Sequence, residues 1–269
     1  MSKVTKIERR IAVQNDDAIK LDQPAPGVLR VAIDRPQVRN ALNPQVRERL
    51  ADIVEQAMGD PAIRAVILTG RGGQFCAGGD LASLAALPKD KVGALLQRGH
   101  RLLRAMIDGR KPVVAAVEGS AAGGGMGLAL AADLVVMGET ARFVLPFFRI
   151  GLVPDYGVMW SLAQRAGPGV ARRLAFLSAP IGAEQALALG LADRVVDDDG
   201  VQQAALEIAQ ALARHPSEAL AWTKRLANAQ PAGLEETLAL EIEAQSDCFG
   251  SDAFTAGVDA FLGRRDAKG

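Results

Sequence analysis

The chain has 269 residues, of which 49% are hydrophobic, and a formal net charge of +0. This length and composition allow a large core, in one large domain or in a domain with an appendage. The balanced charge argues against a nucleic-acid partner. No stretch of about twenty apolar residues predicts a membrane segment, so we expect a cytoplasmic protein. Two cysteines and two histidines give neither a disulfide framework nor the spacing of metal ligands.

The first two thirds of the chain alternate between strand and helix patterns. Residues 28–34, 65–69 and 112–117 are short apolar or alternating runs, which predict strands. Residues 43–58 have helical spacing after a capping Asn43, and residues 90–107 read as a crossover helix between two parallel strands. The expected fold class is therefore α/β.

After residue 157 the patterns are helical throughout. We expect a core domain over residues 1–196 and a helical C-terminal region over residues 197–269. Helices with apolar stripes must pack on something, which here is either the core or a second subunit.

Two glycine-rich segments follow predicted strands. They are "TGRGGQFCAGGDL" at residues 69–81 and "VEGSAAGGGMGLALAAD" at residues 117–133. Neither matches a phosphate-binding loop or a dinucleotide fingerprint. Glycines of this kind bring bare backbone N–H groups to a turn, and two such donors can converge on one oxygen. That is the geometry of an oxyanion hole for a thioester enolate.

Four motifs in order resemble those of the enoyl-CoA hydratase/isomerase family, also called the crotonase family. They are "RPQVRNALN" (35–43), "FCAGGDL" (75–81), "KPVVAAVEGSAAGGGMGLALAAD" (111–133) and "IGLVPD" (150–155). The resemblance implies a spiral of ββα turns and a helical C-terminal trimerisation region. It also implies a homotrimer or a dimer of trimers, and an acyl-CoA substrate whose thioester oxygen accepts two backbone N–H bonds.

Carried onto this chain, the resemblance implies that the two donors are the N–H groups of Ala77 and Gly124. Coenzyme A would enter as part of the substrate, and we expect no permanently bound cofactor and no metal. The resemblance also implies that the loop with Gln74, Phe75 and Cys76 lines the CoA pantetheine, and that Arg264 or Arg265 approaches the CoA phosphates. The apolar Phe147 and Phe148 are expected to shape the far end of the acyl pocket.

The departures from the family pattern concern its two glutamates. Hydratases of the family carry one glutamate two residues after the glycine triplet and another after the proline that matches Pro146. This chain has Gly127 and Phe147 at those positions. Neither side chain can activate water, so simple hydration is disfavoured.

Asp155 is the acid that remains near these motifs. The segment "IGLVPDYGVMWSLAQR" is similar to isomerases that shift a double bond along an enoyl-CoA and to the ring-opening isomerases of phenylacetyl-CoA catabolism. The resemblance implies that Asp155 takes a proton from C2 or C4 of the acyl group and returns it to the other carbon. The alternative is that Asp155 only caps the helix that follows.

His100 leaves a second chemistry open. Aryl-CoA dehalogenases of the family have a catalytic histidine at the matching place and a nucleophilic aspartate at the position of Asp155. By that resemblance Asp155 would attack the ring carbon and His100 would activate the water that hydrolyses the resulting ester. Hydrolysis of the thioester by the same two residues is the related alternative. Against this, Phe147 stands where the dehalogenases have a tryptophan. A third possibility is an acyl-CoA binder without catalysis.

Two further acids and a cysteine have plainer interpretations. Asp80 is expected to fix its loop by accepting bonds from backbone amides. Cys76 is expected to be a small packed residue, since no base for it is visible. Glu118, where a predicted strand ends, is expected to be an ordinary polar residue rather than part of the site.

Overall fold

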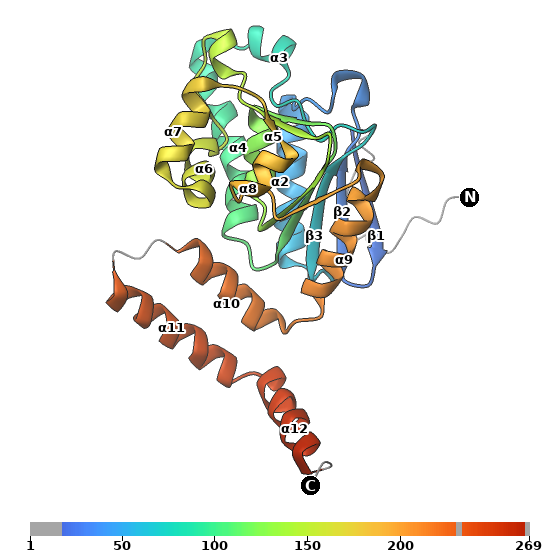
Figure 1. Cartoon of the computed structure of the whole chain (residues 1–269), viewed down its shortest axis with the longest axis vertical. Helices are drawn as coiled ribbons and strands as arrows, with labels where there is room; N and C mark the ends of the chain where they lie inside the picture. The colour runs from blue at the N-terminus through green and yellow to red at the C-terminus, as the bar shows by residue number, and fades with distance from the viewer. Residues whose placement is uncertain (1–17, 230–232, 267–269) are drawn as a thin grey trace, which may run out of the picture.

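The computed structural model describes residues 18–229 and 233–266, with side chains to residue 263. In Figure 1, helices surround a twisted sheet, and the last helices extend away from it toward the C-terminus. The described part therefore has a layered α/β body and a helical extension.

The main sheet has six strands in the order β1-β2-β3-β4-β6-β9. β1 and β2 form an antiparallel hairpin, and each further neighbour pairs in parallel. The predicted strands at 28–34, 65–69 and 112–117 are confirmed as β2, β3 and β4. The strands are β1 (Ile19–Ala25), β2 (Val28–Ile33), β3 (Ala65–Gly70), β4 (Val113–Val117), β6 (Leu134–Gly138) and β9 (Arg194–Val196).

A second, smaller sheet has the order β5-β7-β8. Its strands are β5 (Ser120–Ala122), β7 (Arg142–Val144) and β8 (Ile181–Gly182). β5 leads directly into the glycine triplet at the start of α5 (Gly124–Leu130). The small sheet thus fixes where that triplet lies.

The main sheet is buried on both faces, because alternate residues of each strand point to opposite sides. Val66 and Leu68 of β3 join the core shared with α2 (Pro44–Gly59) and α4 (Val92–Ile107). Ala65 and Ile67 face the opposite side and pack with α9 (Val201–Ala213). Burial on both faces explains why these strands read as unbroken apolar runs.

Both helices predicted in the first half are present. α2 begins after Asn43, whose side-chain oxygen accepts from the N–H of Val46 at 2.8 Å, as expected for an N-cap. α4 follows a short 3-10 turn and carries Leu95, Leu102 and Met106 on its buried face. The two helices pack against each other beside the sheet.

The expectation that everything after residue 157 is helical is wrong. β8 and β9 lie in that region, and at two and three residues they are too short to show a strand period. α9 lies beyond the expected boundary at residue 196 yet packs on the main sheet. The remaining helices are α3 (Leu81–Ala85), α6 (Val158–Ala166), α7 (Pro168–Leu177), α8 (Ala183–Ala188), α10 (Ser217–Asn228), α11 (Leu234–Phe249) and α12 (Asp252–Asp266).

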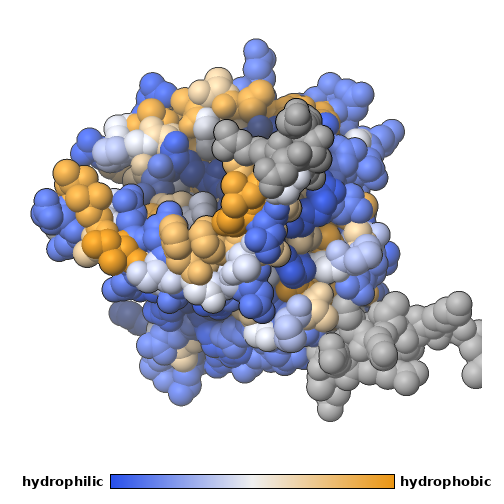
Figure 2. Space-filling model, turned by 90° about the horizontal axis from the view of Figure 1, so that it is seen from below, coloured by the Kyte–Doolittle hydropathy of each residue, from blue (hydrophilic) through white to orange (hydrophobic). Residues whose placement is uncertain are grey.

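The C-terminal helices α11 and α12 expose large apolar side chains. Leu234, Ile242, Phe249 and Phe261 are each more than 60% exposed. Figure 2 views the molecule from this end and shows apolar patches set among hydrophilic residues. Among the described residues, none of the helices combines the length and apolar character needed to cross a bilayer.

Candidate active site

The motif "RPQVRNALN" holds the loop that follows β3. Asn40 is fully buried in a left-handed conformation, with φ 59°. Its side chain accepts from the N–H of Arg35 at 2.8 Å and donates to the carbonyls of Arg71 at 2.9 Å and Gln74 at 2.6 Å. Three satisfied bonds from one buried amide therefore tie this motif to the glycine-rich loop.

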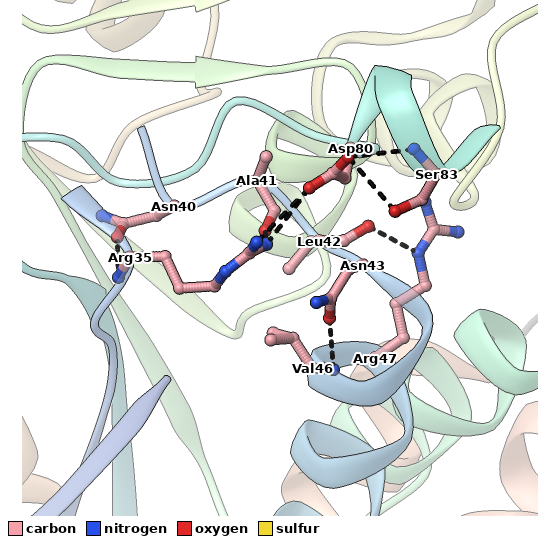
Figure 3. Close-up of polar contacts among 9 residues, drawn as sticks. All are labelled: Arg35, Asn40, Ala41, Leu42, Asn43, Val46, Arg47, Asp80 and Ser83. Atoms are coloured by element: carbon pink, nitrogen blue, oxygen red, sulfur yellow. Dashed lines mark hydrogen bonds and ion pairs between the residues drawn. The ribbon is translucent and has the colours of Figure 1, made fainter. Parts of the chain in front are cut away.

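Asp80 fixes the far end of the same loop, as predicted (Figure 3). Its carboxylate accepts from the N–H and hydroxyl of Ser83 at 3.1 and 3.2 Å, which caps α3, and pairs with Arg35 at 3.4 Å. The bond from the Ser83 N–H is the main cause that lowers the pKa of Asp80. This acid is engaged in the fold and is not free to act on a substrate.

The N–H of Ala77 is not available as an oxyanion donor. It donates to the carbonyl of Arg39 at 2.9 Å. The sequence motif alone could not reveal this bond, because a motif does not show which backbone N–H groups of a loop already have an acceptor. The prediction of Ala77 as a donor is therefore corrected.

Gly79, two residues further on, has an N–H without an acceptor among the described residues. Leu42 bonds the carbonyl of Gly78 at 2.7 Å and the N–H of Asp80 at 3.2 Å. Because backbone groups alternate in direction along an extended chain, the N–H of Gly79 points away from Leu42.

Gly124, which the motif names as a donor, has an N–H that is free to bind an acceptor. It is the first residue of α5, so its N–H has no intrahelical partner, and no described residue outside the helix accepts it. A Cβ built on Gly78 would lie 3.1 Å from the Gly124 nitrogen. The two loops are therefore in direct contact at these donors.

Asp155 lies in a strained turn before α6. Tyr156 and Gly157 both have positive φ, at 51° and 65°, and the carbonyl of Asp155 accepts from the N–H of Val158 at 3.1 Å. The N-cap of α6 is Gly157, with no side-chain cap bond. The capping interpretation of Asp155 is therefore wrong, and its carboxylate is left for another task.

The charge state of Asp155 is set by opposing effects. Burial raises the pKa of Asp155, while the positive charge of Arg47 and, more weakly, that of His100 lower it. His100 is half-buried on α4. Among the described residues no hydrogen bond or ion pair joins His100 to Asp155, so the pairing that the dehalogenase resemblance implies stays a prediction.

Tyr156 is enclosed by glycines. A Cβ on Gly99 would lie 2.6 Å from its hydroxyl oxygen, and one on Gly124 would lie 3.2 Å from its ring. At Gly127 an added Cβ would lie 2.4 Å from the Tyr156 carbonyl oxygen. The position where hydratases carry a glutamate is therefore filled here by the turn that holds Asp155.

Arg47 is a site residue that sequence reasoning missed. It lies on α2, is 2% exposed, and places its guanidinium 5.3 Å from the centre of the Tyr156 ring. Its signal was present in the sequence, because Arg47, Ala51 and Val54 follow the spacing of the buried stripe. A charged residue on such a stripe requires an explanation.

Three of the predicted substrate contacts are structural. Phe75 and Cys76 are fully buried in the core, so their side chains do not reach a ligand, and that prediction is corrected. Burial raises the pKa of the Cys76 thiol to about 12, which leaves it un-ionised at neutral pH. Gln74 uses its side-chain oxygen to accept from the N–H of Ser120 at 3.2 Å, which also fixes the loop.

The two phenylalanines point in different directions. Phe147 is buried, and its ring lies 3.7 Å from a Cβ built on Gly123, next to the donor Gly124. Phe148 is half exposed to solvent. Phe147 is therefore in place to shape the acyl site, whereas the side chain of Arg264 lies outside the described residues.

Two cavities lie apart from these groups. One of about 390 Å³ includes Lys224, whose ammonium donates to the carbonyl of Lys111 at 2.9 Å and pairs with Asp133 at 2.8 Å. The other, of about 530 Å³, includes Glu118, which accepts from Gln202 at 2.9 Å. Burial raises the pKa of Glu118. Their polar groups have protein partners, so we assign neither cavity a reaction.

Comparison with known proteins decides the family. The model for "Enoyl-CoA hydratase/isomerase" matches residues 24–268. The chain belongs to the enoyl-CoA hydratase/isomerase family. It is 40% identical to a "Probable enoyl-CoA hydratase" of Rhodobacter capsulatus over 89% of this chain and 93% of that protein. It is 36% identical to the "1,2-epoxyphenylacetyl-CoA isomerase" of Escherichia coli, over 90% and 94%.

A solved structure from the same family confirms the fold. The enoyl-CoA hydratase of Bacillus anthracis superposes with a TM-score of 0.88 at 28% identity, covering 92% of this chain and 96% of that one. The predicted α/β crotonase fold is thereby confirmed. Family membership makes this an enzyme that processes acyl-CoA thioesters, and its relatives carry both hydratase and isomerase names.

Proposed function

We propose that this protein is an enoyl-CoA isomerase that moves a proton with Asp155. The observation that carries the proposal is the carboxylate of Asp155, which sits in a strained turn without serving as a helix cap. Beside that turn the ring of Tyr156 packs on Gly124, which, like Gly79, has an N–H without an acceptor among the described residues. An acid and a pair of backbone donors are what a proton shift next to a thioester requires.

The proposed reaction has two proton transfers. The carboxylate of Asp155 removes a proton from C2 or C4 of the acyl group, and the electrons move onto the thioester oxygen. The N–H groups of Gly79 and Gly124 hold that oxygen while it is negative, and Gly79 replaces Ala77 in this role. The carboxylic acid of Asp155 exchanges its proton with solvent and then protonates the other carbon, so the double bond moves and no water is consumed. No resident cofactor takes part, because CoA arrives and leaves with the substrate.

Hydration by the family's two-glutamate route is disfavoured. Gly127 and Phe147 occupy the two positions, and the space for a side chain at Gly127 is taken by the Tyr156 backbone. Phe147 is apolar and buried. Without either glutamate, the site has no pair of acids to activate a water molecule.

The test is to incubate a 3-enoyl-CoA in deuterated water and follow the product by mass spectrometry. Wild type should yield the 2-enoyl isomer with deuterium incorporated. Asp155→Asn keeps the shape but removes the base, so the rate should fall by about 10²- to 10⁴-fold. Asp90→Asn, at an exposed carboxylate, is the matched control and should retain the wild-type rate. Equal rates for wild type and Asp155→Asn would refute the proposal.

His100 supports a second candidate. Its charge acts on Asp155, which is the pairing that an ester-forming and hydrolysing mechanism needs. This reading predicts halide release from a halogenated aryl-CoA, and loss of that release in both Asp155→Asn and His100→Gln. If the thioesters bind but neither reaction occurs, the protein is an acyl-CoA binder.

We also propose that α11 and α12 assemble copies of the chain, as a homotrimer or a dimer of trimers. The support is the set of large apolar side chains that these helices expose, since soluble monomers rarely leave such groups gathered together. Analytical ultracentrifugation should give a mass of three or six chains. Ile242→Glu should shift the mass toward the monomer, whereas a monomeric wild type would contradict the proposal.

A further inference from the structure

Arg47 carries a buried donor that nothing in the protein uses. Its Nε donates to the carbonyl of Leu42 at 3.1 Å, whereas its Nη1 is buried and has no hydrogen-bond partner. It forms no ion pair within the part of the chain that the structure describes. A buried guanidinium nitrogen without an acceptor is unusual, because burying it unbonded costs the full loss of its hydration.

Tyr156 adds a second unused polar group at the same place. Its hydroxyl is buried and has no hydrogen-bond partner among the described residues, although the Arg47 guanidinium lies over its ring. Burial raises the pKa of this hydroxyl to about 12, and the nearby charge of Arg47 lowers it. Tyrosine hydroxyls in protein interiors usually find a partner. Two neighbouring unmet groups on different elements, α2 and the turn before α6, indicate an acceptor that both could reach.

This pair lies beside the proposed thioester site. The Nη2 of Arg47 is 3.0 Å from the position of a Cβ built on Gly79, and the Tyr156 ring packs on Gly124. Gly79 and Gly124 are the glycines whose N–H groups are proposed to bind the thioester oxygen. An acceptor bound by Arg47 and Tyr156 would therefore lie within a few bonds of the thioester oxygen.

We propose that Arg47 and Tyr156 bind a second oxygen of the substrate, a ketone or carboxylate oxygen on one of the first few carbons of the acyl chain. The inference rests on the proposed acyl-CoA site and names the class of acyl group that the site prefers. A guanidinium and a hydroxyl match either oxygen, since both accept two hydrogen bonds. A plain hydrocarbon chain would leave both donors unmet in the complex.

The experiment measures binding of saturated thioesters, which have no double bond to isomerise. Calorimetry gives the Kd of butanoyl-CoA, 3-oxobutanoyl-CoA and 3-carboxypropanoyl-CoA. Wild type should bind one of the oxygenated thioesters about 10- to 100-fold more tightly than butanoyl-CoA, as expected for hydrogen bonds that involve a charged donor. Which of the two is preferred distinguishes a ketone from a carboxylate.

Two variants and a control locate the preference. Arg47→Met should abolish it, and Tyr156→Phe, which only removes the hydroxyl and should fold normally, should reduce it several-fold. Arg98→Met, at an exposed arginine on α4, should leave it unchanged. A wild-type preference below about twofold, or one that survives both variants, would overturn the inference and indicate that water satisfies the donors.

The outcome is separable from that of the proposed function. Equal binding of all three thioesters together with deuterium incorporation would overturn only the second-oxygen site. Preferential binding without deuterium incorporation would overturn only the isomerase reaction. Failure to bind any of the three, together with no deuterium incorporation from the 3-enoyl-CoA, would overturn both.

Discussion

Arg35 and Arg47 lie twelve residues apart, and both are withdrawn from solvent, but their surroundings differ. Arg35 bonds the carbonyl of Ala41 and pairs with Asp80, so its charge has an opposite charge beside it. Arg47 has one carbonyl and an aromatic ring. The comparison indicates that Arg35 stabilises the fold. Arg47 instead has, within the described residues, the unpaired donor expected of a residue that binds a ligand.

The largest expected effect is the loss of stability on replacing Arg35, the arginine whose donors have partners in the fold. Arg35→Met would leave Asp80 without its ion-pair partner and release the carbonyl of Ala41. We expect the free energy of unfolding to fall by about 2 kcal/mol, because breaking a largely buried pair leaves the other charge uncompensated. Chemical denaturation measures this, and a variant as stable as wild type would contradict the structural role of Arg35.

Arg47→Met should behave differently in the same measurement. Methionine has similar reach and carries no charge to bury, so its free energy of unfolding should stay within about 1 kcal/mol of wild type. This near-neutral result, set against the loss at Arg35, would mark Arg47 as a group held for function. If Arg47→Met lowered the free energy of unfolding as much as Arg35→Met does, the two arginines would have the same structural role and the comparison would fail.

The smallest effect concerns pH. Burial raises the folded pKa of Asp155 above its ordinary 3.8, so the base becomes active only above that raised value. Activity should fall as pH decreases through it. The ionised carboxylate also costs stability above that pKa, and the cost is relieved as pH falls through it toward the unfolded value.

Arg47 sharpens this prediction. Its charge lowers the pKa of Asp155, so Arg47→Met should move the acid limb of the kcat/KM profile to higher pH. Arg98→Met, on the exposed side of α4, should leave the limb in place. A limb that stays fixed in Arg47→Met would show that Arg47 does not act on Asp155.

The sequence predicted those parts of the fold that have a clear period or a clear motif. The strands β2, β3 and β4 are apolar runs buried on two faces, and α2 begins at its expected cap. β8 and β9 were not predicted, because strands of two and three residues are too short to show the alternation of apolar and polar residues. Their place depends on strands that are distant in sequence, which local patterns do not encode.

The candidate site was predicted in its outline and missed in its hydrogen bonding. Asp155 and Gly124 could be named from motifs, but the choice between Ala77 and Gly79 depends on which N–H meets Arg39. The burial of Phe75 and Cys76 likewise follows from how the loop packs. Arg47 was visible as a charge on an apolar stripe, although only the structure shows that its donor is unmet.

The close contact between Gly127 and the Tyr156 backbone bears on how such a protein can change during evolution. Any side chain at residue 127 would meet that backbone, so a glutamate cannot be added there while the turn keeps its shape. The turn in question also holds Asp155. A glutamate introduced at residue 127 by one substitution would first disturb the turn that carries Asp155. Adding that glutamate therefore requires coordinated changes in the turn at Tyr156.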